Sequence, residues 1–161
     1  MATDMFIKID GVKGESVDSK HKDEIDILGW SWGISQSGSM QSSSGGGAGR
    51  ANVQDLSFTK YTDKSTALLV DSSATGKHLK KAVITVRKAG EKPLEYLTVT
   101  LEDVMVSSVS LGGAEGNELL TENVTLNFAK YTIDYIPQSK KGAGGAAVSS
   151  SFDAAKNMAK G

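Results

Sequence analysis

Most of the chain alternates apolar and polar residues with the period of two that is typical of β-strands. We expect strands over residues 5–9, from Ile25 to Ile34, and over residues 53–60, where Leu56 and Phe58 share one face. The same alternation covers residues 81–88, 94–110 and 123–136. The pattern therefore predicts a mainly β protein.

The alternation changes phase at three places, and each change indicates a bend in a strand. At Leu28-Gly29 the apolar positions move from odd to even numbers, which is the signature of a β-bulge beside a glycine. Similar shifts occur near Glu102-Asp103 and between Phe128 and Tyr131. Long strands that bend are typical of barrels and tightly coiled sandwiches. We predict one antiparallel β-barrel, formed as a tightly packed two-sheet barrel.

One segment, residues 63–75, has the pattern of a helix that flanks the barrel. Asp63 or Ser65 is suited to cap its start, and Gly76 is suited to end it. Between them, residues 67–70 supply a short apolar patch.

Three segments do not fit a barrel core. Residues 36–51 are nearly all Ser, Gly and Gln, and a loop of this length in a compact domain is usually functional or disordered. Residues 111–118 form a second glycine-rich loop, and the segment from Gln138 begins as a Gly/Ala/Lys stretch. We therefore divide the chain into a barrel domain, 1–137, and a flexible linker with a short C-terminal tail, 138–161.

Composition narrows the class of protein. The 161 residues fit one domain, and 18 basic against 19 acidic side chains give a net charge of −1. This balance argues against nucleic acid or an anionic membrane as the main partner. There are no cysteines, which excludes disulfides and thiolate chemistry. The first residues do not resemble a cleaved signal peptide, and no apolar run is long enough for a membrane helix, so we predict no membrane insertion.

The motifs that suggest catalysis are weak. Gly29-Trp30-Ser31-Trp32-Gly33 matches the G-x-S-x-G nucleophile elbow, but that chemistry needs a strand-to-helix turn, and this segment has a strand pattern. Its base would have to be His21 or His78, both of which we expect on the solvated surface. Two separate histidines do not make a typical zinc site. We predict no catalytic residue, no cofactor and no metal.

Several longer runs, taken in order, resemble the haemolysin-coregulated protein (Hcp) family of the bacterial type VI secretion system. The resemblance extends over nearly the whole chain, and the runs that carry it are residues 5–9, 12–16, 25–33, 35–40, 52–61, 63–66, 107–110 and 121–129. The run from Val53 to Tyr61 is especially specific. The family often ends in a Gly-Trp-Asp-like motif, of which Phe152-Asp153 is only a weak counterpart.

The resemblance implies a secreted structural subunit and no enzyme. It implies a homo-hexameric ring, stacked with other rings as the inner tube of a contractile sheath and carrying a spike protein. It also implies that small effectors bind in the ring lumen before export. The subunit would reside in the bacterial cytoplasm before firing, and then outside the cell or in a target cell.

The resemblance also suggests which residues make contacts. We expect Ser31, on the strand face opposite Trp30 and Trp32, to lie on a polar face that lines the lumen and contacts effectors. We expect the extended loop 36–51 to contact the next ring or subunit. The residues of that loop assigned to the contact are Gln36, Ser39, Met40, Ser43, Gly46, Gly49 and Arg50. Trp30, Trp32, Leu56, Phe58, Leu126 and Phe128 are expected in the core.

Two other functions remain open from the residues alone. One is a monomeric β-barrel carrier or adhesin whose glycine-rich loops hold a ligand. The other is a serine hydrolase built on residues 29–33, which would react with an active-site serine probe at Ser31.

Overall fold

The computed structural model describes residues 3–38, 48–138 and 145–159. The chain forms ten strands and one helix over these residues. The elements are β1 (Thr3–Ile9), β2 (Ile25–Ser31), β3 (Ile34–Gly38), β4 (Ala48–Val53), β5 (Leu56–Tyr61), α1 (Thr66–Thr75), β6 (His78–Lys88), β7 (Leu94–Leu111), β8 (Thr121–Tyr135), β9 (Val148–Asp153) and β10 (Met158–Ala159).

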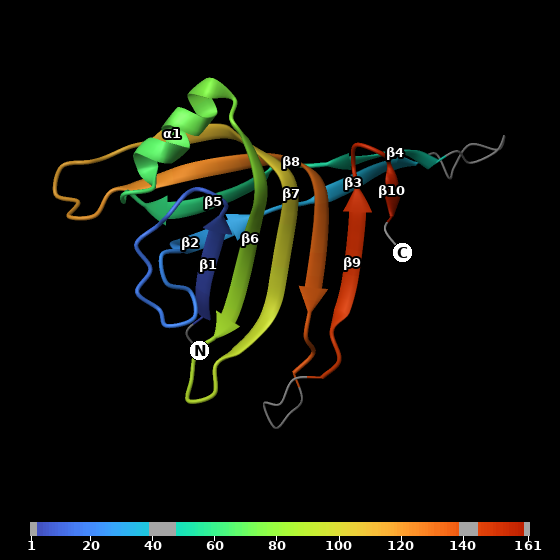
Figure 1. Cartoon of the computed structure of the whole chain (residues 1–161), viewed down its shortest axis with the longest axis horizontal. Helices are drawn as coiled ribbons and strands as arrows, with labels where there is room; N and C mark the ends of the chain where they lie inside the picture. The colour runs from blue at the N-terminus through green and yellow to red at the C-terminus, as the bar shows by residue number, and fades with distance from the viewer. Residues whose placement is uncertain (1–2, 39–47, 139–144, 160–161) are drawn as a thin grey trace.

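Six strands close into an antiparallel barrel (Figure 1). Their order is β8-β5-β2-β1-β6-β7, and β7 pairs in turn with β8 to complete the circle. Closure leaves the strands of the barrel wall with partners, which removes most of the free edges of an open sheet. The predicted mainly β barrel with one helix is confirmed.

The core fills the interior of this barrel. Leu56 and Phe58 of β5 point inward, as predicted, and Val124 and Leu126 of β8 face them across the ladder. All four side chains are buried. A buried aromatic or branched aliphatic side chain contributes about 1.5–3 kcal/mol relative to exposure, so this alternation is the main drive for closure.

The strands bend where the apolar phase changes. The β2–β5 ladder shifts register between Ile27 and Gly29, which confirms the predicted bulge. In β7, Asp103 adopts a positive φ of 55°, an unusual backbone angle that marks the predicted bend. In β8, the first part pairs with β5 and the second part with β9. The phase change between Phe128 and Tyr131 lies between these two parts, so it lets each part turn its apolar side inward.

Helix α1 begins and ends close to the predicted positions. Ser65 is its N-cap residue, although its side chain makes no capping bond. Instead, Asp63 Oδ1 accepts a hydrogen bond from the Ser65 backbone N–H at 2.9 Å. Gly76 ends the helix in the left-handed conformation, φ 64°, which glycine adopts without a Cβ clash. The helix buries Leu69, while Leu68 and Val70 remain exposed.

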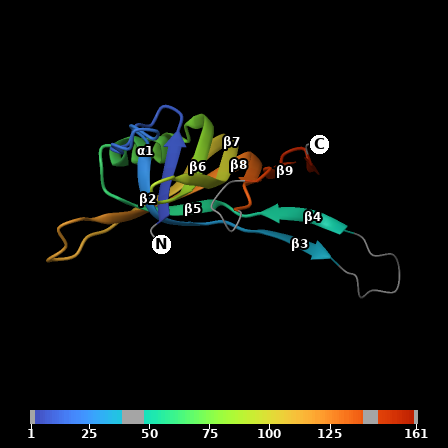
Figure 2. The ribbon, with the colours of Figure 1, turned by 90° about the horizontal axis from the view of Figure 1, so that it is seen from below.

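The segment predicted as a long loop, 36–51, contains strand structure. β3 and β4 pair as a two-stranded ribbon, with Gln36 opposite Ala51, and we call this ribbon the arm. Figure 2 shows the arm extending away from the barrel. The prediction of a loop was therefore wrong at its two ends, 36–38 and 48–51, where the Ser- and Gly-rich sequence shows no strand alternation and the backbones pair all the same. Residues 39–47 at the end of the arm lie outside the described part.

The C-terminal segment adds a strand that the alternation pattern did not reveal. β9 pairs with the second part of β8, from Lys130 opposite Asp153 to Tyr135 opposite Val148, and β10 pairs with β9. Much of β9 is Ser, so its membership of the sheet depends on backbone pairing. The division into 1–137 and 138–161 stays a prediction.

The two tryptophans are less buried than expected. Trp30 and Trp32 pack against the core but are only half-buried, unlike Leu56, Phe58, Leu126 and Phe128. Trp32 packs against Tyr131 with the rings tilted and their centres 4.7 Å apart, and its indole N–H donates to the Gln54 carbonyl oxygen at 2.8 Å. An indole needs such an acceptor, which holds it at the edge of the core.

Candidate functional site

Hydroxyl and amide side chains cover the outer face of four neighbouring strands, β2, β5, β8 and β7. Register partners in an antiparallel sheet share a face, so the pairing defines two rows. One row runs Ser31, Ser57, Thr125, Ser108. The next runs Gly29, Thr59, Asn123, Ser110. We call these two rows the hydroxyl face, and neither contains a charged residue.

The side chains of the hydroxyl face bond to one another across the strands. The Ser57 and Thr125 hydroxyls lie 3.1 Å apart, and the Thr59 hydroxyl donates to Asn123 Oδ1 at 2.7 Å. These mutual bonds fix the side chains and satisfy part of their hydrogen-bonding capacity. The result is a polar surface without a charged residue in either row.

One carboxylate, Asp55, lies beside the hydroxyl face. It accepts hydrogen bonds from the Ser107 hydroxyl and from the Asn127 amide, both at 2.9 Å. Two donors therefore hold this charge against the sheet. Asp55 and the Ser57 and Thr59 positions were not selected from the sequence, although alternation with Leu56 and Phe58 places them on the outer face.

Ser31 lies on a polar outer face of the barrel, and its contact with a lumen or an effector stays a prediction. It is exposed at the end of β2, in the first row of the hydroxyl face, with Ser57 as its register partner. Ser108, Ser110, Asn123 and Thr125 share that face with it.

Three of the arm residues assigned to the contact are described. Gln36 is exposed on β3, and Gly49 and Arg50 belong to β4. Arg50 Nη2 donates to the Ala154 carbonyl oxygen at 2.9 Å, which ties the arm to the turn after β9. Ser39, Met40, Ser43 and Gly46 lie outside the described residues.

The structure argues against the nucleophile elbow. Ser31 ends one strand and β3 follows at Ile34, so no helix begins after it to support an oxyanion. Within residues 3–38, 48–138 and 145–159, no group of three or more potential metal ligands is found. In the same described ranges no helix is long and apolar enough to cross a membrane.

The prediction that His21 is a solvated surface residue was wrong. It is only 7% exposed, and its ring stacks on Phe6 with centres 4.3 Å apart. The lysines on both sides of it in the sequence suggested exposure, but the loop folds back so that the imidazole meets β1. His78, by contrast, is exposed as predicted.

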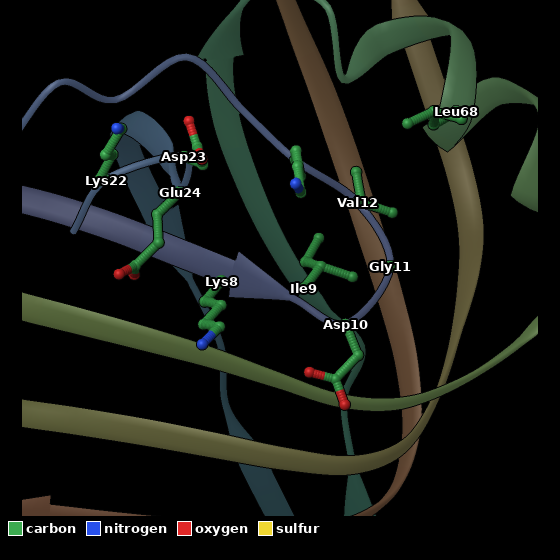
Figure 3. Close-up of a pocket in the computed structure, with 10 residues that line it drawn as sticks. Lys8, Ile9, Asp10, Gly11, Val12, Lys22, Asp23, Glu24 and Leu68 are labelled. Carbon is green, nitrogen blue, oxygen red and sulfur yellow. The ribbon is translucent and has the colours of Figure 1, made fainter.

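A pocket of about 520 Å³ lies beside this loop (Figure 3). Ile9, Val12 and Leu68 provide its apolar lining, and three lysines and three carboxylates surround them. The charged residues are Lys8, Asp10, Lys13, Lys22, Asp23 and Glu24. It lies between the loop after β1 and helix α1, and it includes no residue of the hydroxyl face.

Comparison with known proteins identifies the family. A family model described as "Type VI secretion system effector, Hcp" matches residues 6–135. "Protein hcp1" of Pseudomonas aeruginosa is 58% identical over 144 residues, covering 89% of each chain.

Solved structures agree. "Structure of a type six secretion system protein" matches with a TM-score of 0.93 and 27% identity, covering 99% of this chain and 100% of that chain. The crystal structure of Hcp1 from Salmonella typhimurium matches with a TM-score of 0.81 and 35% identity over the same shares. The chain therefore belongs to the Hcp family, the non-enzymatic, secreted structural proteins of the type VI secretion system.

Proposed function

We propose that this chain assembles into hexameric rings that stack as the inner tube of a type VI secretion system. A contractile sheath surrounds the tube and propels it together with a spike protein. The subunit resides in the bacterial cytoplasm until firing and then leaves the cell with the tube. Membership of the Hcp family is the observation that carries this proposal.

The hydroxyl face supports a luminal role. A tube that holds varied cargo and then releases it needs a surface with weak and uniform contacts. The two rows from Gly29 and Ser31 to Ser110 and Ser108 fit that need because they are uncharged, and in each row one pair of side chains is hydrogen-bonded across the strands. We assign this face to the lumen, with Ser31 in contact with small effectors.

The arm supports a role in assembly. It projects from the barrel (Figure 2), and Arg50 of β4 ties it to the turn after β9. A projecting ribbon that is tied to its own subunit is suited to reach a neighbouring subunit or ring. Removal of residues 42–49 is expected to leave folded subunits that stack poorly, as counted in electron micrographs. Unchanged tube formation by the deletion variant would exclude the arm as a stacking contact.

The first experiment is to measure the mass of the purified protein by light scattering on a sizing column, with negative-stain images of the same peak. A hexamer mass with six-fold rings is the expected result. A protein that stays monomeric at high concentration, with or without a spike protein to nucleate rings, would favour a monomeric carrier or adhesin.

A further inference from the structure

Two carboxylates hold the ring of His21 from opposite sides. Its Nδ1 lies 2.8 Å from Glu24 Oε2, and its Nε2 lies 2.7 Å from Glu95 Oε1. Glu24 belongs to the same loop as His21, whereas Glu95 lies near the start of β7. The imidazole therefore connects the loop between β1 and β2 to a distant strand of the barrel.

Phe6 provides a second attachment for the same loop. Its ring is nearly parallel to the His21 imidazole, at an angle of 12°. The Arg87 guanidinium carbon lies 5.1 Å from the centre of that Phe6 ring. Arg87 donates to Asp18 in the loop and to Asp4 in β1, each at 3.0 Å. These hydrogen bonds to Arg87 hold the pKa of Asp18 well below its ordinary value.

Whether both carboxylate contacts are hydrogen bonds depends on which nitrogens of the His21 ring carry a proton. A neutral imidazole has one N–H donor and one acceptor nitrogen, while an ionised carboxylate only accepts. Both short contacts of His21 are hydrogen bonds to ionised carboxylates only when both ring nitrogens carry a proton. With a neutral ring, one nitrogen lone pair would face a carboxylate oxygen.

We propose that His21, Glu24, Glu95 and Phe6 form a protonation-dependent clasp on the loop of residues 10–24. When both nitrogens of His21 carry protons, the clasp is closed and the loop is fixed to β7. Loss of one proton releases one carboxylate and loosens the loop. This inference does not depend on the proposed tube function.

Charged groups of both signs surround the clasp. From the loop itself, Glu24 and Asp18 lie near the ring, and Lys20 and Lys22 flank His21 in the sequence. From β7, Glu95 meets the ring, and Arg87 of β6 lies beyond Phe6. Asp4 of β1 and Asp26 of β2 lie in the neighbouring acidic group. Burial, together with Asp18 and Asp4, raises the pKa of Asp26.

The loop held by the clasp forms one wall of the pocket in Figure 3. Backbone bonds brace this wall, including Gly14 N–H to the Asp23 carbonyl at 2.8 Å and Ser16 N–H to the Glu24 carbonyl at 3.0 Å. Glu24 both lines the pocket and accepts from His21. Opening of the clasp would therefore change the shape of the pocket.

The test combines imidazole NMR with hydrogen exchange on the full-length protein. The chain has two histidines, so exposed His78 serves as the internal reference for the ring signals. With the clasp closed, His21 is expected to show two ring N–H protons. As His21 loses a proton with rising pH, the protection of the Gly14 and Ser16 amides should fall roughly tenfold to a hundredfold, corrected for intrinsic exchange.

Glu95→Gln separates the clasp from a general effect of pH. A glutamine amide both donates and accepts, so a neutral His21 would keep both contacts, and the loop amides should stay protected across the same pH range. His78→Gln is the matched control and should behave like the wild type. A single ring N–H on His21 with the loop amides protected would overturn the proposal. So would protection that stays constant while His21 loses its proton, or a Glu95→Gln variant that loses protection as the wild type does.

Discussion

Removal of Lys60 should reveal how the barrel holds its helix. Lys60 of β5 and Glu122 of β8 are direct register partners, and their side chains are 0% exposed. The Lys60 ammonium forms an ion pair with Glu122 and lies 3.0 Å from Asp63 Oδ1. Thr66, the first residue of α1, donates its hydroxyl to Glu122 Oε1 at 2.8 Å. The group therefore joins the start of α1 to two strands of the barrel.

The Lys60→Met variant keeps an unbranched side chain, shorter by one atom, and removes its charge. Glu122 would then be a buried carboxylate without its cation, and loss of one partner of a buried pair costs about 3–5 kcal/mol. We expect the free energy of unfolding to fall by that amount. The measurement is denaturant unfolding at several fixed protomer concentrations, since assembly adds to apparent stability.

Two further variants decide whether the reasoning is correct. Lys64→Met changes an exposed lysine four residues further along and should alter stability by less than about 0.5 kcal/mol. Lys60→Met combined with Glu122→Leu removes both charges and should regain most of the loss, because a well-packed apolar pair is often as stable as a buried ion pair. If Lys60→Met is as stable as Lys64→Met, the buried pair does not hold the helix.

Three other variants test the lumen, the loop and the charge cluster. Ser31→Gln on the hydroxyl face should reduce co-purification of effectors while stability changes by less than about 0.5 kcal/mol, and Ser19→Gln in an exposed loop should change neither. Gly14→Ala would place a Cβ against the Glu24 carbonyl oxygen and should lower the free energy of unfolding by about 1–3 kcal/mol. The Cβ of Gly29→Ala would meet open space, so this variant should lose less stability. The hydrogen bonds from Arg87 lower the pKa of Asp18 in the folded state. The stability that this pair contributes is therefore complete at pH values above the pKa of Asp18 in the unfolded chain, and it is lost as the pH falls. Melting curves of wild type and Asp18→Asn should therefore differ at neutral pH and converge progressively below about pH 5.

The sequence by itself determined which face each strand residue takes and where a bulge and the helix end lie. Alternation placed Leu56 and Phe58 inside the barrel and Ser31 on the outer side, because side chains in a strand point to opposite faces in turn. The glycines carried further local information: Gly29 marked the bulge in β2, and Gly76 ended the helix. Family membership was also predictable, since long specific runs such as residues 53–61 are properties of sequence.

Only the tertiary structure decided which distant residues meet. Lys60 can be buried because Glu122, 62 positions away, becomes its partner in the ladder. His21 is enclosed because Glu95, 74 positions away, approaches the loop from another strand. Lysine is ordinarily exposed and histidine is intermediate, so no local pattern distinguishes these two from Lys64 or His78. Periodicity indicates which face a side chain takes, whereas burial of a polar or charged side chain depends on a partner that only the folded chain brings close.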